Sequence, residues 1–193
     1  MGLGKQAKTL SKGQVEAVLG YLAKTRHPER NRVIFLLSVK AGLRAKEIAF
    51  LTWDMITEAT GTLGRAIHLR DEASKGQSGR VIPLNEELRR ALVAWRAIAP
   101  KTSLFVVSTE RSERTSAQAI VNLFSRWYDE LGLIGCSSHS GRLSFITHAA
   151  RRIPTVGGSI RDVQILAGHS SLRTTQRYIE PNSDAQRKVV ALL

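Results

Sequence analysis

The chain has 193 residues, which suits a single domain, and 42% of them are hydrophobic, which excludes wholesale disorder. Its 29 Lys and Arg residues outnumber 16 Asp and Glu, so the formal net charge is +13. This excess indicates a polyanionic partner, most simply nucleic acid, with an anionic lipid surface or a merely basic surface as alternatives. The single cysteine, Cys136, excludes an intrachain disulfide, and no apolar run reaches the length of a membrane span.

The first part of the chain predicts three helices. A capping-box pattern opens the first, over 10–24. A proline at its start and a glycine at its end bound the second, over 28–42. The third, over 44–56, begins at or just after Leu43 and has its apolar residues at helical spacing.

A change of pattern then predicts a small sheet. The segments 65–70 and 79–84 alternate apolar and polar residues, which is typical of two antiparallel strands, and the turn-rich segment 71–79 joins them. The segment 103–108 predicts either a third strand or a short buried connector. Further helices are predicted over 85–99, 116–132, 140–152, 159–167, 171–179 and 182–192. The predicted fold class is therefore α+β, mainly α, with one small antiparallel sheet.

Arg44 lies at the start of the third predicted helix. A cation there interacts unfavourably with the helix dipole, and an anion bound at the same point would compensate for this. Glu47, three residues later, can hold the guanidinium in position. The alternative is an ordinary surface arginine paired with Glu47.

Two later segments carry similar candidates. His139 and Arg142 are three residues apart around a helix start and can face the same point, and Gly141 leaves room for a backbone or ligand to approach. His169 follows the end of a short helix, and Tyr178 lies nine residues later on the next predicted helix. Taken alone, a packing role is the ordinary interpretation of this tyrosine.

Together with a loop lysine, Lys75, these residues favour attack on a phosphodiester. Arginine forks match phosphate oxygens and stabilise the transition state without a metal. A tyrosine can form a covalent phosphotyrosine that stores the phosphodiester bond for rejoining. A histidine can take the phenolic proton, and a lysine can protonate the leaving 5′-oxygen.

In chain order, four segments resemble the motifs of tyrosine recombinases of the phage-integrase family, over roughly residues 10–185. They are "AGLRAKEIAFLTW" with Arg44 and Glu47, "ASKGQSGRVIPL" with Lys75, "HSGR" with His139 and Arg142, and "LAGHSSLRTTQRYIEP" with His169 and Tyr178.

The resemblance implies a role for each matching residue. Tyr178 would attack the scissile phosphate and become joined to its 3′ side, while Arg44, Arg142 and His169 would hold the phosphate oxygens. Lys75 would act as general acid toward the 5′-hydroxyl, and His139 would accept the phenolic proton. The resemblance also implies the helical catalytic-domain fold of the family and a reaction that needs neither cofactor nor metal. Whether the product is integration, excision, inversion or resolution stays open.

The resemblance further implies double-stranded DNA as partner, a homo-oligomer (a tetramer) on DNA, accessory DNA-bending proteins, no membrane, and a cytoplasmic, nucleoid-associated location in a bacterium or phage-infected cell. We expect a basic arm over 1–10, a catalytic domain over 11–181, and a C-terminal helix over 182–193. That helix docks either on a neighbouring protomer or on its own domain. Typical family members carry an N-terminal core-binding domain before this region, so we expect the sequence either to resemble the short members made of the catalytic domain alone or to be a fragment.

Three other functions fit parts of the pattern. One is a catalytically silent DNA-binding regulator of the same fold. Another is a metal-dependent nuclease using Asp71 and Glu72, although their spacing matches no usual metal set. The last is a type IB topoisomerase, which shares the chemistry but needs no specific DNA site.

Overall fold

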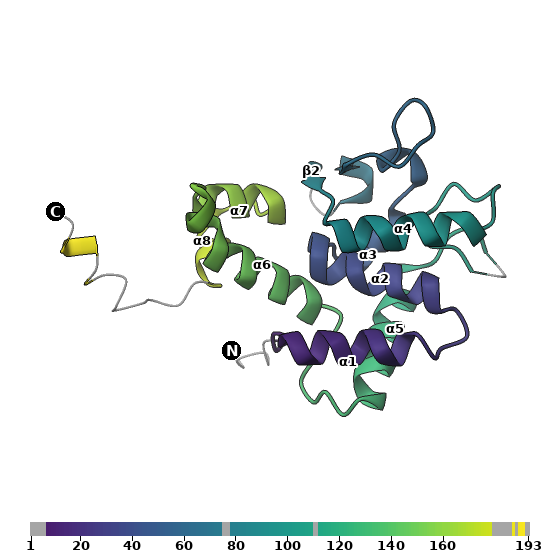
Figure 1. Ribbon diagram of the computed structural model, residues 1–193, viewed down its shortest axis with the longest axis horizontal. Coiled ribbons are helices and arrows are strands. Elements are labelled where there is room, and N and C mark those ends of the chain that lie inside the picture. The colour runs from purple at the N-terminus through teal and green to yellow at the C-terminus, as the bar shows by residue number, and fades with distance from the viewer. Residues whose placement is uncertain (1–6, 75–77, 110–111, 179–186, 188, 192–193) are drawn as a thin grey trace.

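A computed structural model describes residues 7–74, 78–109, 112–178, 187 and 189–191. Within these ranges the chain is mainly helical with one two-stranded antiparallel sheet, which confirms the predicted fold class. Helices α6, α7 and α8 lie to one side of the larger group formed by α1 to α5 (Figure 1). No helix in the described ranges is long and apolar enough to cross a bilayer.

The first two helices begin with the predicted capping box and proline, and the second ends at the predicted glycine, whereas the first ends two residues before the predicted position 24. In α1 (Lys12–Leu22), the Ser11 hydroxyl accepts from the Gln14 amide, and the Gln14 side chain accepts in return from the Ser11 amide. In α2 (Pro28–Ala41), Gly42 ends the helix in the left-handed conformation, with φ +64°. A glycine adopts this conformation at little cost, so the chain turns sharply just before Arg44.

Helix α3 (Ala45–Phe50) begins where predicted but is shorter than the 44–56 expected. Leu51 and Thr52 are extended, and Thr52 pairs with Phe105 in an isolated antiparallel bridge. The chain leaves the helix here because its backbone pairs with residues 104–106 instead. A 3-10 turn, Trp53–Met55, occupies the remainder of the predicted helix.

The sheet consists of β1 (Ala66–Leu69) and β2 (Arg80–Pro83), with Leu69 opposite Arg80. A 3-10 turn, Asp71–Ala73, begins the segment between them. The segment 103–108 is a mostly buried connector, with Leu104 exposed, rather than a third strand, because it makes a single bridge outside the sheet.

The main core lies around α2, α4 (Glu86–Ile98) and α5 (Ala117–Glu130). Phe35 of α2 packs near Phe124 of α5, and Phe124 contacts the rings of Trp127 and Tyr128 at 5.3 and 5.9 Å between centroids. Aromatic clusters of this kind bury a large apolar area, so the contact between Phe35 and Phe124 stabilises the packing of α2 near α5.

A second, smaller core joins α6 (Ser140–Arg152) and α7 (Ile160–Ala167), and Tyr178 packs against it. Helix α8 (Leu172–Gln176) packs against α7. Helix α6 packs against α2 as well as α7, so it connects the two cores. Gly141 permits this contact, since a Cβ there would lie 2.3 Å from the Ser38 hydroxyl. The space predicted at this glycine is therefore taken by α2, not by a ligand.

The end of α8 differs from the prediction. The helix ends at Gln176, so Tyr178 lies just beyond it rather than within a helix over 171–179. Most of the predicted helix over 182–192 lies outside the described residues. At the other terminus, the described part of the arm packs on the domain, since Leu10 is buried and its amide donates to Ser144 Oγ at 2.6 Å.

Candidate active site

Arg44 and Glu47 form the first part of the site. Arg44 is the N-cap residue of α3, and its backbone amide donates to Glu47 Oε2 at 2.9 Å. Its guanidinium Nη1 donates to Glu47 Oε1 at 2.8 Å. The Glu47 side chain is fully buried, whereas that of Arg44 is 23% exposed. The acid therefore orients a guanidinium that remains accessible from outside.

Arg80 is a second, buried partner of the same carboxylate. Its Nη1 and Nη2 donate to the two Glu47 oxygens at 3.0 Å each, a bidentate pair. Its Nε donates to the carbonyl of Leu166 near the end of α7, at 2.9 Å. Burial alone would raise the pKa of Glu47, but the hydrogen bonds and charges of Arg80 and Arg44 bring it below its usual value. Glu47 is therefore a buried carboxylate between two arginines.

Arg142 lies in α6, buried, between two other segments of the site. Its Nη1 donates to the carbonyl of Gly42, just before Arg44, and its Nη2 donates to the carbonyl of Ala167, just before Gly168. Burial, and then the charge of Arg44, lower the pKa of Arg142. Since a guanidinium has five N–H donors, these two bonds leave others for a ligand.

His169 is positioned by the end of α7 and by α8. Gly168 ends α7 with φ +61°, and the His169 carbonyl accepts from Gln164 Nε2 at 2.8 Å. Its ring Nδ1 lies 3.0 Å from the hydroxyl of Thr175, which is fully buried. Burial and the charges of Arg142 and Arg44 lower the pKa of His169 to about 4. The ring is therefore neutral at physiological pH.

Tyr178 lies beside His169. The two rings are stacked, with centroids 5.8 Å apart and planes 17° from parallel. Tyr178 is half-buried against the smaller core, and it contributes to the electrostatic environment of Arg142. It also lines a pocket of about 340 Å³ together with Lys8, Arg151 and Arg177. The phenol thus lies among cationic side chains, close to the outside of the protein.

The two remaining predicted residues are His139, at the surface, and Lys75, outside the described residues. His139 is the exposed N-cap residue of α6, three positions before Arg142, and its amide donates to Ser137 Oγ at 3.3 Å. Lys75 lies outside the described residues, in the segment between Ser74 and Ser78. The structure therefore brings together Arg44, Arg142, His169 and Tyr178, with His139 at the start of the helix that carries Arg142.

The charges in this group do not balance. Arg44 and Arg80 share one carboxylate, Glu47, and the charge of Arg142 is added to theirs. With His169 neutral, three guanidinium charges against one carboxylate leave an excess of two positive charges. Guanidinium groups bind the oxygens of phosphate in a bidentate manner, so the arrangement suits an anionic phosphate.

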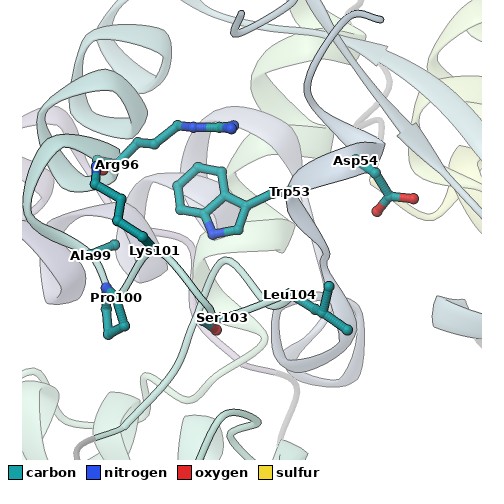
Figure 2. A pocket seen from close by; sticks show the side chains of 8 residues that line it. All are labelled: Trp53, Asp54, Arg96, Ala99, Pro100, Lys101, Ser103 and Leu104. Carbon is teal, nitrogen blue, oxygen red and sulfur yellow. Dashed lines mark hydrogen bonds between the residues drawn. The ribbon is translucent and has the colours of Figure 1, made fainter. Parts of the chain in front are cut away.

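Other pockets lie away from Arg44, Arg142, His169 and Tyr178. The pocket in Figure 2 has a volume of about 260 Å³, and the Arg96 guanidinium that lines it lies over the Trp53 ring, 4.9 Å from the ring centroid. None of the predicted site residues that the structure describes lines it.

Asp71, proposed above as a metal ligand, instead accepts a hydrogen bond from the Gly79 amide at 2.7 Å. Among the described residues, no three His, Cys, Asp or Glu side chains are grouped to hold a metal ion.

Sequence reasoning did not assign a role to Arg80 or to the carbonyl groups that hold Arg142. For Arg80 a signal was present: the alternation of β2 places it on the same face as Ile82, which is buried. An arginine in a core-facing register requires a partner, because an unpaired buried charge is strongly destabilising. The carbonyl partners of Arg142 carried no such signal, because every residue has a backbone carbonyl.

Comparison with known proteins is consistent with this arrangement. The model of the phage integrase family matches residues 8–184. Tyrosine recombinase XerA of Thermococcus onnurineus (strain NA1) is 31% identical over 185 residues, covering 94% of this chain and 61% of that protein. Tyrosine recombinase XerC of Haemophilus influenzae (strain PittEE) is 31% identical over 187 residues, covering 92% and 59%. The chain thus spans about three fifths of the length of these curated relatives.

Solved structures of similar fold include a transposon integrase in complex with DNA and a recombinase. The Tn1549 transposon integrase in complex with a circular intermediate DNA has a TM-score of 0.79 at 17% identity, covering 99% of this chain and 67% of that one. The crystal structure of XerA recombinase has a TM-score of 0.71 at 21% identity, covering 100% and 65%. At these identities the likeness establishes the fold.

Proposed function

This chain belongs to the phage integrase family, and we propose that it is a site-specific recombinase that cleaves and rejoins DNA strands through a covalent 3′-phosphotyrosine. The observation that carries the proposal is the excess of two positive charges beside the stacked rings of His169 and Tyr178. Such a site favours a phosphate with a tyrosine next to it. The names of the relatives and the DNA in related structures support the same activity.

In this proposal Tyr178 is the nucleophile. Its hydroxyl oxygen attacks phosphorus, the bond to the 5′-oxygen breaks, and the 3′ side remains joined to the tyrosine. His139 accepts the phenolic proton, and Lys75 donates a proton to the departing 5′-oxygen. Reversal of these steps by another 5′-hydroxyl rejoins the strand, so no external energy source is required.

Arg44, Arg142 and His169 stabilise the charge that develops on the phosphate oxygens. Neutral His169 can do this as a donor. In the tautomer whose Nδ1 accepts from the Thr175 hydroxyl, Nε2 carries the proton and can donate it in a hydrogen bond to a phosphate oxygen. Fixed donors of this kind need no reorganisation during the reaction, which is their catalytic advantage.

We further propose that the catalytic domain comprises residues 11–181 and acts on double-stranded DNA as a homotetramer, with accessory DNA-bending proteins as additional partners. Residues 1–10 serve as a basic arm and residues 182–193 as a C-terminal helix. Such an enzyme acts in the cytoplasm at the nucleoid. The net charge of +13 supports a nucleic-acid partner.

A nicked suicide substrate tests the proposal. After cleavage the short strand end diffuses away, so the covalent adduct accumulates and is measured by denaturing gel electrophoresis in excess EDTA. The wild-type chain is expected to form the adduct, whereas Tyr178→Phe binds the same DNA without forming it. DNA binding with no adduct at any site tested would instead support the silent regulator, and cleavage abolished by EDTA would support the nuclease.

A further inference from the structure

The geometry points to Arg80 as a positioning residue for this reaction, which holds Arg44 through Glu47 and the His169 segment through the carbonyl of Leu166. This inference rests on the proposed function. No role in catalysis follows for Arg80 from the motifs considered above. Its own side chain is only 3% exposed, so it acts through neighbouring groups rather than by touching the DNA.

The first link is through Glu47. This carboxylate is fully buried, and a buried charge must be paired to remain ionised. The Arg44 guanidinium uses one donor on Oε1, whereas Arg80 binds both oxygens. Arg80 therefore fixes the plane of the carboxylate, and the carboxylate in turn fixes the Arg44 guanidinium and the first turn of α3.

The second link is to the end of α7. Arg80 Nε donates to the Leu166 carbonyl at 2.9 Å, three residues before His169. The Arg80 side chain also packs closely on Gly168, where an added Cβ would lie 2.8 Å from Nη1. Glycine is therefore needed at position 168 for space as well as for its positive φ. These contacts set the distance between α3 and the segment that carries His169.

A third contact concerns the loop before β2. Arg80 is the first residue of that strand, and its Nη1 lies 3.3 Å from the carbonyl of Ser78. Arg80 thus joins Ser78, two residues before it in the chain, to the segments of Arg44 and His169. No other described arginine bonds to Glu47 and to α7 at the same time. A single side chain therefore connects three parts of the site.

The test compares Arg80→Met, which keeps an unbranched apolar stem but removes every donor, with Glu47→Gln and the double variant. Single-turnover cleavage of the nicked substrate and DNA affinity are measured separately. Arg80→Met is expected to slow cleavage about 100-fold, the scale for misplaced catalytic groups, while DNA affinity changes little. The double variant should be no slower than the slower single variant, because both changes disrupt one network.

A matched control is Arg32→Met, which breaks the ion pair with Glu87 between α2 and α4. It should leave cleavage unchanged. Urea denaturation checks that each variant is folded at the assay temperature. The inference is overturned if folded Arg80→Met cleaves at the wild-type rate, if the two single effects multiply, or if lost DNA affinity accounts for the whole decrease.

A second measurement keeps this inference separate from the proposed function. NMR signals of the arginine Nε–H groups report how firmly each guanidinium is held, whether or not the protein cleaves DNA. The Arg44 signal should shift and broaden in Arg80→Met but not in Arg32→Met. An unchanged Arg44 signal refutes the positioning role, whereas absence of any wild-type adduct refutes the proposed function alone.

Discussion

The ring of His169 is stacked on the ring of Tyr178, with the two planes 17° from parallel and 5.8 Å between their centroids. Beyond this contact, the His169 ring is tied to Thr175, and the Thr175 carbonyl accepts from the Tyr178 amide at 3.0 Å. One buried threonine therefore orients both the histidine and the residue proposed as nucleophile.

Thr175→Val should consequently slow cleavage. The variant keeps the shape of the side chain but removes the hydroxyl that forms a hydrogen bond with His169 Nδ1. We expect a decrease of about 10- to 100-fold, below the loss expected for removing a transition-state donor outright. The assay is single-turnover adduct formation, and nitrogen-15 NMR of the imidazole reports the tautomer. Thr174→Val, at the neighbouring position, is the control and should behave as wild type.

The low pKa of His169 predicts how stability depends on pH. The imidazole has a pKa of about 4 in the folded chain and about 6.5 when unfolded. Between these values the unfolded chain binds a proton that the folded chain does not. The free energy of unfolding should therefore fall as pH decreases from about 6.5 to about 4.

Urea denaturation across this pH range measures the effect. Because burial and neighbouring cations also lower the pKa of His148, the relevant quantity is the difference between wild type and His169→Asn. The variant should lose part of the pH dependence. An NMR titration of the His169 ring with a midpoint near 6.5 would contradict this prediction.

Arg142→Lys should lose both activity and stability. Lysine keeps the charge but presents a single ammonium group, which cannot reproduce the two-sided contact with the carbonyls of Gly42 and Ala167. We expect cleavage to fall about 100- to 1,000-fold, and unfolding to become easier by about 1–3 kcal/mol because a buried acceptor is left unpaired. Single-turnover cleavage and urea denaturation measure the two effects. Near wild-type cleavage would remove Arg142 from the proposed mechanism.

Gly141→Ala should separate α6 from α2. The added methyl group would lie 2.3 Å from Ser38 Oγ and 2.9 Å from Val39 Cγ1, so one of the helices must shift. We expect destabilisation of about 1–3 kcal/mol, the usual cost of overpacking, together with slower cleavage because Arg142 moves with α6. Gly20→Ala in α1 is the control: its Cβ meets nothing within 4 Å, so higher helix propensity should make it neutral or stabilising.

DNA binding should weaken steeply with salt. In a plot of log affinity against log salt concentration, the slope is expected to be about −0.9 for each phosphate that the protein neutralises. Arg44→Ala should make this slope shallower by about one phosphate and also reduce cleavage. Fluorescence anisotropy with a short duplex measures the slope, and a slope unchanged in Arg44→Ala would contradict contact between Arg44 and the DNA.

Sequence patterns predicted most helices and the two strands because their signals are local. The capping pair of Ser11 and Gln14 and the left-handed Gly42 each depend on residues a few positions away. The early end of α3 could not be predicted in this way, because it depends on pairing between Thr52 and Phe105. The end of α8 before Tyr178 was likewise missed.

The sequence by itself determined which residue types are available for phosphate chemistry and their order along the chain. Only the tertiary structure decided how they are held. Arg142 is positioned by carbonyls from segments 100 and 25 residues away, and Glu47 is shared with an arginine 33 residues away. The carbonyl contacts of Arg142 have no local signature, and the alternation of β2 indicates that Arg80 is buried but not which residue it pairs with. These contacts arise from the packing of α2, α6, α7 and β2. That packing places Tyr178 beside His169 and an unbalanced positive charge.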